Sequence, residues 1–343
     1  MAIQLEPLTA AHLDAATAMV AERYRAARAQ IPILPAPYME AGAIAPRLSS
    51  HIGHVPGVVA LEAGRPIGFA MSLLVPNRGE RMAVVPDFGH AAAPDREYEL
   101  YRLMYARIAD WWVDNGCFLH AVTLYPHEQA ASAAWFSVGF GLAVMEALRV
   151  VSSPVATQAR TRPIGIQIRR AQPKDVDSVA TVELALSRHL AESPAYLPLV
   201  LDERQATLEK WIANQEHALW LAFCDGAAVA YLRFEPSEQI VLPTSAETTV
   251  AITGAFTRKD LRGMGIGAEL LRTGLEWAHS AGYLHCSVDF ESANLPGSAF
   301  WVRHFEPVTQ SLMRRVDPRL AWAHARRGET DLRRSLEGHS WIG

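Results

Sequence analysis

The sequence predicts an α/β protein of the α+β type, built as two copies of one unit. Three observations support this prediction. The chain has 343 residues, a length that suits two domains of about 150 residues each. Apolar residues make up 50% of it and charged residues 20%, which is typical of a globular protein. Short patterns also recur in the second half of the chain in the order they have in the first, as expected of an internal repeat.

Each copy opens with a helix and continues with a hairpin. Residues 8–14 (LTAAHLD) and 171–177 (AQPKDVD) each begin an amphipathic helical pattern. The segments VVALEAGRPIGFA at 58–70 and WLAFCDGAAVAYL at 220–232 each contain two apolar runs around a glycine turn, which is the signature of a hairpin. Helical spacing predicts one face of the first helix: Leu13, Thr17, Val20 and Tyr24.

The rest of each copy is predicted to be a further strand, a helix, a strand, a short helix and a final strand. Residues 111–122 and 277–288 match as a helix end, a glycine stop and a strand. Residues 134–141 and 300–307 match as a short helix rich in aromatic side chains, again 166 residues apart. In the second copy the β-branched segment 248–256 predicts the strand before a glycine loop.

These repeats predict the domain boundaries. We expect a first domain at 1–151, a second at 164–317 and a C-terminal tail at 318–343. Residues 152–163 (SSPVATQARTRP) are rich in serine, proline, threonine and arginine, as a linker would be.

Composition excludes several classes of function. The net charge of −4 gives no basic surface for nucleic acid or an anionic membrane. The N-terminus carries acidic residues where a signal peptide has basic ones, and no apolar run approaches the roughly 20 residues that span a bilayer. Cys117, Cys224 and Cys286 are odd in number and lie in apolar contexts, so we expect core thiols of a reducing compartment, without metal. We therefore expect a cytoplasmic protein, either a monomer (a pseudo-dimer within one chain) or a weak homodimer.

The segment LRGMGIGAELL at 261–271 carries three glycines at alternate positions, directly after Arg262 and before a helical pattern. A helix start without side chains leaves backbone N–H groups bare, and these groups and the helix dipole bind anions such as phosphate. The helix that follows is predicted to have one apolar face: Ile266, Leu270, Leu271, Leu275 and Ala278.

Three interpretations of this glycine run compete. It could be a turn without a ligand, since such motifs often mislead. It also fits the G-x-G-x-x-A form of a dinucleotide fingerprint, with Asp289 following at a strand end, although the charged segment 257–262 separates the strand from the glycines. The third interpretation is that residues 262–267 (RGMGIG) resemble the R/Q-x-x-G-x-G/A signature of the GNAT superfamily of N-acetyltransferases.

The resemblance implies two tandem GNAT-like domains, each a mixed, mostly antiparallel central sheet flanked by helices. One degenerate copy ahead of an intact one is similar to the layout of mycothiol synthase and related tandem GNAT enzymes. It also implies that the loop amides hold the pyrophosphate of acetyl-CoA, the cosubstrate, and that the preceding strand pairs with its pantetheine arm. Asn294 stands where the family has an asparagine on that arm, although a helix N-cap explains it as well. The implied binding residues are Ala255, Phe256, Thr257, Arg262, Gly263, Met264, Gly265, Ile266, Gly267, Ala268 and Asn294.

The first copy lacks this loop. A shift of 166 residues places Arg96 at the position of Arg262, Glu99 at that of Gly265 and Tyr101 at that of Gly267. A carboxylate thus occupies the position where the second copy would bind phosphate. A phenol ring occupies the position of a glycine that would let the ligand approach the backbone closely. We expect the first domain not to bind CoA in the usual way.

The resemblance further implies acyl transfer to the amine of a small molecule, with the second domain catalytic. A general base should deprotonate the amine, and a backbone N–H of 255–257 should stabilise the oxyanion. The candidate bases are Asp289 and Glu291, on the polar face of strand 283–292, and Glu247. Trp301 stands where the family often has a tyrosine acid, so the thiolate could leave unaided, or His304 or Tyr283 could protonate it. The alternative is a non-catalytic acyl-CoA-binding or regulatory protein.

Overall fold

The structure is a computed structural model that describes residues 3–77, 79–155, 165–199, 205–237 and 241–320. Most of the predicted linker (156–163) and the predicted tail from residue 321 lie outside the described residues.

Contacts divide the chain into two compact units. Unit 1 comprises the described residues up to Ala143 and from Thr309 onward, and unit 2 comprises Val144–Val308. Each repeat therefore gives its final strand to the other unit: β8 (Gly141–Val150) pairs with β13 (His285–Glu291) in unit 2, and β14 (Glu306–Arg315) pairs with β7 (Leu119–Leu124) in unit 1. The boundaries expected at 1–151 and 164–317 follow the sequence repeats, whereas the compact units follow this exchange of strands.

Unit 1 contains two groups of paired strands. One has the order β1-β2-β3-β6, and the other contains β4-β5-β7-β14. The strands are β1 (Gln4–Pro7), β2 (Gly57–Glu62), β3 (Arg65–Met71), β4 (Leu73–Asn77), β5 (Glu80–Val85) and β6 (His90–Ala92), in addition to β7 and β14. The helices are α1 (Leu13–Gln30), α2 (Ala41–Ser49), α3 (Glu97–Asp114) and α4 (Gln129–Ser137), with short 3-10 turns at Ala10–His12, Ala36–Met39 and Asp87–Gly89.

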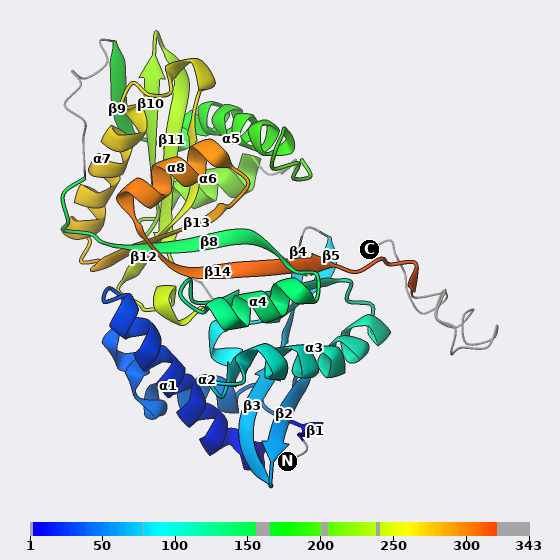
Figure 1. The fold of residues 1–343 in the computed structure, drawn as a ribbon. Coiled ribbons are helices and arrows are strands. Elements are labelled where there is room, and N and C mark those ends of the chain that lie inside the picture. The colour runs from blue at the N-terminus through cyan, green and yellow to red at the C-terminus, as the bar shows by residue number, and fades with distance from the viewer. Residues whose placement is uncertain (1–2, 78, 156–164, 200–204, 238–240, 321–343) are drawn as a thin grey trace. The chain divides into compact units, whose positions relative to one another are not determined.

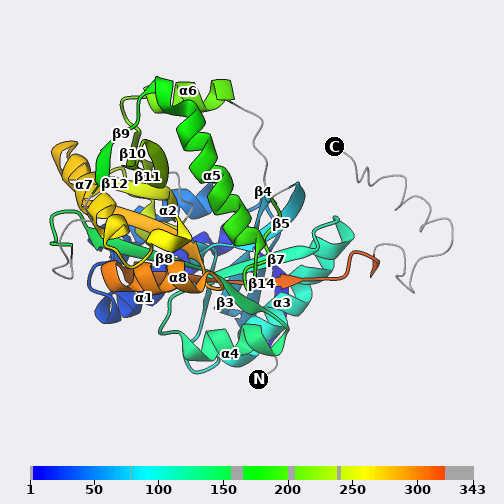
Figure 2. The same cartoon turned by 90° about the horizontal axis from the view of Figure 1, so that it is seen from above.

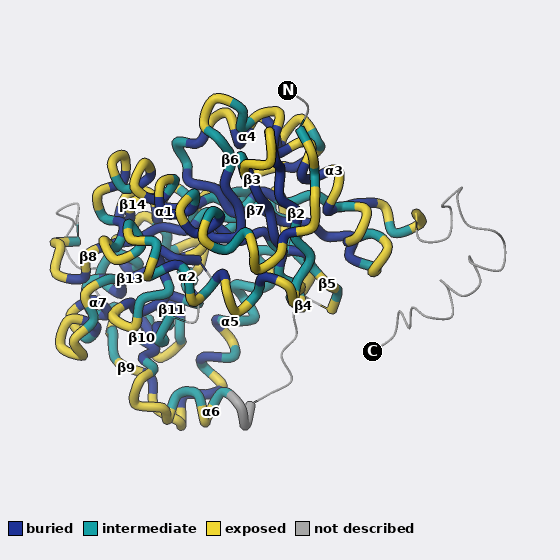
Figure 3. Tube along the Cα trace, turned by 90° about the horizontal axis from the view of Figure 1, so that it is seen from below, coloured by how far each residue is buried: buried dark blue, intermediate teal, exposed yellow. Residues whose placement is uncertain are grey.

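Helix α3 and helix α4 form the core of unit 1 with the strands. Their buried side chains, among them Tyr105, Trp112 and Trp135, pack together with Val58 of β2 and Val122 of β7. Helix α1 packs on β3 and β6. The buried strands β2, β3 and β7 appear dark blue in Figure 3, with exposed turns of α3 in yellow.

Unit 2 is a mixed, mostly antiparallel sheet with helices on both faces. Its strand order is β8-β13-β12-β11-β10-β9, and only β12 and β13 run parallel. Helices α7 and α8 pack on one face, and α5 and α6 on the other (Figures 1 and 2). The remaining strands are β9 (Ile166–Arg170), β10 (Ala218–Cys224), β11 (Ala227–Pro236) and β12 (Thr249–Thr257). The helices are α5 (Val176–Ala191), α6 (Gln205–Ala213), α7 (Ile266–Ser280) and α8 (Leu295–His304), with 3-10 turns at Pro173–Asp175, Leu242–Thr244 and Lys259–Leu261.

The two sequence repeats contain the predicted elements in order, together with elements that were not predicted: an opening strand (β1, β9) and a second helix (α2, α6) in each, and three strands (β4, β5, β6) in the first where one was expected. The predicted hairpins are confirmed. β2-β3 and β10-β11 are antiparallel pairs joined by two residues with positive φ, Ala63-Gly64 and Asp225-Gly226. Such turns match the twist of a hairpin and favour glycine. The apolar face predicted for 266–278 is also confirmed, because all five of its side chains are buried in α7. The alternation of residues 283–292 predicts that Leu284 shares one face with Cys286, Val288 and Phe290, but Leu284 precedes β13 and is 58% exposed, so only the other three are buried.

Candidate functional site

The central feature of unit 2 is the separation of β12 from β13. Their parallel pairing runs from Thr249 and His285 to Ile252 and Val288, and then ends. At the same point β12 has a bulge, because β11 pairs with Ile252 and Gly254 and skips Thr253. Beyond the bulge, β12 is paired with β11 but not with β13 through residue 257. Its backbone therefore offers an open edge at which an extended chain with amide groups could pair.

The bulge is held by Arg233 of β11. Its Nε donates to Thr253 Oγ1 at 2.9 Å, and its Nη2 donates to the Thr253 carbonyl oxygen at 3.2 Å. The same guanidinium forms an ion pair with Glu183 of α5 at 2.9 Å and lies over the ring of Trp211. Sequence reasoning missed Arg233, because nothing in its local pattern indicates a bulge in the neighbouring strand.

The glycine loop lies where β12 leads into α7. Gly265 is the N-cap of the helix with φ of 85°, and Gly263 has φ of 77°, a region that favours glycine. A Cβ built on either residue would meet no atom within 4 Å. No side chain therefore covers the start of α7 at these two positions, and the first amides of a helix, which have no partner within it, are the groups that bind an anion.

Arg262 adds a positive charge to this loop. Its Nε donates to the Thr257 carbonyl oxygen at 3.0 Å, and partial burial lowers the pKa of its guanidinium by desolvation. Within the part of the chain that the structure describes, no carboxylate pairs with it, whereas the neighbouring Arg258 is paired with Asp260 at 2.8 Å. The first-turn amides of α7, which have no acceptor within the helix, thus lie next to a cation without a carboxylate partner among the described residues, and together they fit a phosphate group.

Asp289 lies at the mouth of the separation between the strands. It is the first residue of β13 after the pairing with β12 ends. Its neighbours Val288 and Phe290 pack toward α7 and α8, so its side chain points to the opposite face. The carboxylate reaches solvent although many protein atoms surround it, and this desolvation raises its pKa above the usual value.

The other two candidate bases are placed differently. Glu291 follows Asp289 on the same face and is half-buried. Glu247 precedes β12 at the end where the pairing with β13 begins. It lies in the turn before Thr249, and Thr249 is four residues from Thr253, about 13 Å at roughly 3.3 Å per residue. The structure therefore brings Asp289 and Glu291 to the open edge of β12 but leaves Glu247 at the far end of that strand.

Asn294 is the N-cap of α8. Its Oδ1 accepts from the backbone N–H of Gly297 at 3.3 Å and from His189 Nε2 of α5 at 3.2 Å. The N-cap role considered from the sequence is therefore observed. The amide group also ties α8 to α5 beside the end of β13.

The aromatic residues of α8 separate into two environments. Trp301 is buried in the core of unit 2 against Phe305, which confirms that it is a packing residue. Phe300 instead faces the loop, since a Cβ on Gly267 would lie 3.4 Å from its ring. The ring of His304 lies 4.7 Å from that of Phe300, and burial lowers its pKa. A neutral imidazole is a weak acid. Tyr283 precedes β13, at the end where the pairing with β12 begins.

In the corresponding loop of unit 1 the positive charge of the arginine is neutralised by two carboxylates. Arg96 forms ion pairs with Glu62 at 2.9 Å and with Glu99 at 2.8 Å. Tyr101, at the position of Gly267, is buried, and its hydroxyl donates to His90 Nδ1 at 2.9 Å. The Nε2–H of His90 donates to the carbonyl oxygen of Thr123 on β7 at 2.8 Å. Side chains thus fill the space between β6 and β7.

A buried ion pair closes unit 1 further. Arg23 of α1 binds both carboxylate oxygens of Glu128, the N-cap of α4, at 2.6 and 2.7 Å. These residues are 166 positions before His189 and Asn294. A contact between the first long helix and the N-cap of the short helix is therefore a buried ion pair in unit 1 and a histidine–asparagine hydrogen bond in unit 2. The sequence register of the opening helices (8–14 and 171–177) places Leu186 at the position of Arg23, so it does not reveal this pair.

Comparison with known proteins agrees with this geometry. Residues 187–305 match the family described as Acetyltransferase (GNAT) family. A GCN5-related N-acetyltransferase from Sphaerobacter thermophilus superposes with a TM-score of 0.60 at 14% identity, covering 91% of this chain and 95% of that one. A glucosamine N-acetyltransferase region of a fungal multi-domain β-N-acetylglucosaminidase gives 0.53 at 14% identity, covering 91% of this chain and 38% of that one. At such identities these structures show the shared fold alone. No curated protein sequence matched.

Among the described residues, no helix combines the length and apolar character that crossing a membrane requires. No three His, Cys, Asp or Glu side chains among them gather in a way that could hold a metal ion.

Proposed function

Residues 187–305 form a GNAT acetyltransferase domain, and on that premise we propose that the chain is an acyl-CoA-dependent N-acyltransferase whose unit 2 is catalytic. The acyl donor is acetyl-CoA, and the acceptor is the amine of a small molecule. The observation that carries the proposal is the open glycine loop with the uncompensated Arg262, next to the unpaired edge of β12.

The donor would be bound mainly by backbone. The amides of residues 263–268 and the guanidinium of Arg262 would hold the pyrophosphate, since helix N-termini favour negative charge by up to about 2 kcal/mol. The unpaired backbone of residues 255–257 would bind the amide groups of the pantetheine arm. The Nδ2 group of Asn294 would be a further donor to that arm, because its Oδ1 is used by the helix cap.

Asp289 is the preferred general base. It lies where β12 and β13 separate, and its raised pKa brings its basicity closer to working pH. As the acceptor nitrogen forms its bond to the acyl carbon and the carbon–sulfur bond breaks, Asp289 takes the nitrogen's proton. A backbone N–H of residues 255–257 would stabilise the oxyanion. The side chains at 300 and 301 offer no hydroxyl, so the thiolate would leave without help from them, as a pKa near 8.5 permits.

Unit 1 would shape the protein without binding acyl-CoA. The charge of Arg96 is neutralised by two carboxylates, and the side chains of Tyr101 and His90 fill the space between β6 and β7. We propose that it is a structural or substrate-shaping copy.

The alternative is a protein that binds acyl-CoA without transferring the acyl group. The lack of a hydroxyl at Phe300 and Trp301 favours it, because these two side chains cannot protonate the leaving thiolate. Both functions require donor binding, and only one releases thiol.

The experiment is to incubate the chain with acetyl-CoA and a panel of small amines, and to follow free thiol. Amine-dependent release that the Asp289→Asn variant loses is the expected result. Donor binding without release on any amine would support the alternative function. Absence of donor binding would refute both.

A further inference from the structure

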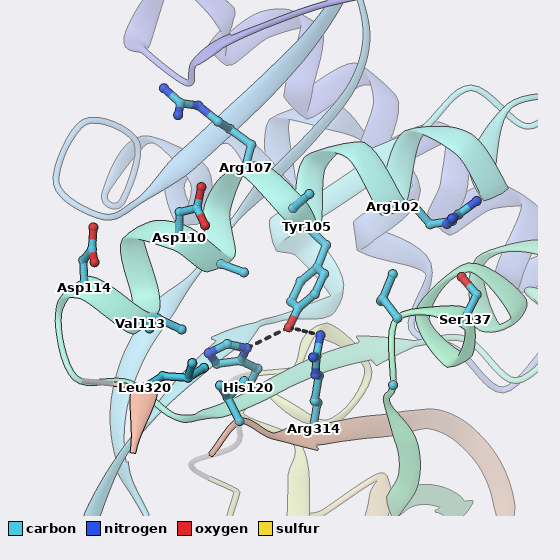
Figure 4. A pocket seen from close by; sticks show the side chains of 15 residues that line it. Arg102, Tyr105, Arg107, Asp110, Val113, Asp114, His120, Ser137, Arg314 and Leu320 are labelled. Atoms are coloured by element: carbon cyan, nitrogen blue, oxygen red, sulfur yellow. Dashed lines mark hydrogen bonds between the residues drawn. The ribbon is translucent and has the colours of Figure 1, made fainter. Parts of the chain in front are cut away.

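Unit 1 contains a pocket of about 850 Å³ that is separate from its closed loop. It lies between α3, the end of α4 and the last residues of β14, and Figure 4 shows it from close by. This volume is within the range of small-molecule sites. Small residues make it hollow, because Ala106 and Ala109 of α3 and Gly139 after α4 line it without long side chains.

Three polar side chains converge on the pocket, and their protons can be assigned from their partners. The Nε2 of His120 lies 3.0 Å from the Cys117 carbonyl oxygen, so Nε2 carries the proton and Nδ1 accepts. The Tyr105 hydroxyl therefore donates to Nδ1 at 3.0 Å, and Arg314 Nη1 donates to the Tyr105 oxygen at 3.0 Å. Burial lowers the pKa of His120 to about 4, so the imidazole is neutral at pH 7. This chain of hydrogen bonds fixes the position of Arg314 without neutralising the positive charge of its guanidinium.

Two arginines that line the pocket lack a carboxylate partner among the described residues. They are Arg314 and Arg102, and the guanidinium of Arg102 lies over the ring of Tyr98. The neighbouring Arg315, outside the pocket, is paired with Glu80 at 2.6 Å. An arginine held in place without a carboxylate favours a ligand that brings one, since guanidinium and carboxylate form paired hydrogen bonds.

The acidic residues of the pocket lie at the opposite end from Arg102. Asp110 and Asp114 lie further along α3, and Arg107 points away from the pocket in Figure 4. Asp110 is eight residues from Arg102, about 12 Å at 1.5 Å per residue. Between these ends α3 presents an apolar stripe of Ala106, Ala109 and Val113.

We propose that this pocket binds a small carboxylic acid with an apolar body, its carboxylate on Arg314 and its body along the apolar stripe of α3. Tyr105 and His120 are positioning residues that hold Arg314. This site is independent of the acyl-CoA site proposed for unit 2.

The test uses two probes of nearly equal shape, 4-phenylbutyrate and its neutral amide, with the full chain and ligand-detected NMR. The acid should bind at millimolar concentrations or better, and the amide at least tenfold more weakly. Arg314→Met should abolish binding of the acid, whereas Arg315→Met, which removes the same charge outside the pocket, should leave it unchanged. Ala106→Trp fills the pocket from an exposed position and should also abolish binding if Arg314→Met fails to fold.

The site is wrong if both probes bind equally, if neither binds, or if the acid survives Arg314→Met and Ala106→Trp. Binding at the acyl-CoA loop is distinguished by repeating the titration with Met264→Glu and with acetyl-CoA present. The affinity for the acid should be the same in Met264→Glu and in the presence of acetyl-CoA as in the parent chain alone. A weaker affinity under either condition would overturn the assignment. Because these readouts need no catalysis, the result is independent of whether unit 2 transfers an acyl group.

Discussion

Met264 offers the sharpest perturbation of the proposed phosphate site. It lies between Gly263 and Gly265, is 42% exposed and does not have a positive φ, so it can be replaced without strain. Met264→Glu adds a negative charge beside the expected pyrophosphate, and Met264→Gln adds the same shape without the charge.

The expected magnitude follows from Coulomb's law. Two phosphate charges about 8 Å from the new carboxylate, at an effective dielectric constant of about 40 for a half-exposed site, repel it by about 2 kcal/mol. Affinity for acetyl-CoA should therefore fall about 30-fold in Met264→Glu relative to Met264→Gln. The difference should shrink at high salt, since the charges are close to solvent.

The assay is calorimetric titration with acetyl-CoA at low ionic strength, together with thermal melts. A carboxylate near a helix N-terminus stabilises the helix by about 0.3 to 1 kcal/mol, so the melting temperature of Met264→Glu should not fall below that of Met264→Gln. Equal affinities in the two variants would refute the assignment of the loop to phosphate.

Four further predictions concern the base and the buried groups. Asp289→Asn should lower kcat at least 100-fold and leave acetyl-CoA affinity unchanged, whereas Glu247→Gln should leave both unchanged; equal effects in steady-state assays would exclude Asp289. Because the pKa of Asp289 is raised by burial, its ionisation destabilises the fold as pH rises through that pKa, so Asp289→Asn should melt no lower than the parent at pH 7, and a lower melting temperature would contradict this. Arg23→Met should lower the free energy of unfolding, measured in urea, by about 3 to 5 kcal/mol, because it leaves Glu128 buried and unpaired. The double variant with Glu128→Met should recover most of this loss, and no recovery would exclude the pair as its cause. Trp301→Tyr should lower the melting temperature without raising the rate, because the residue is buried in the core; a faster enzyme would contradict that placement.

Much of the fold could be predicted because each repeated pattern has a local physical cause. Glycine turns, alternating strands and the apolar face of 266–278 depend only on nearby residues, and they are found as predicted. The exchange of final strands could not be predicted. β8 and β14 carry similar patterns, and a repeat does not specify which of two related sheets a strand joins.

The candidate site was predictable to a lesser extent. The loop and Asp289 follow from motif and alternation, and the structure places both next to the open edge of β12. The positive φ of Gly263 and Gly265 adds a conformational reason for glycine that the sequence reasoning did not separate from phosphate binding. Arg233 and the Arg23–Glu128 pair depend on contacts between distant segments, and no local pattern signals them.

The number of acetyl-CoA sites per chain tests the central claim most directly. Calorimetric titration of the parent chain should give one site, which Met264→Glu weakens. Tyr98→Glu, the same change at the corresponding exposed position of unit 1, should leave that site unchanged. Two equivalent sites, no site, or a single site that responds to Tyr98→Glu and not to Met264→Glu would contradict the assignment of donor binding to unit 2.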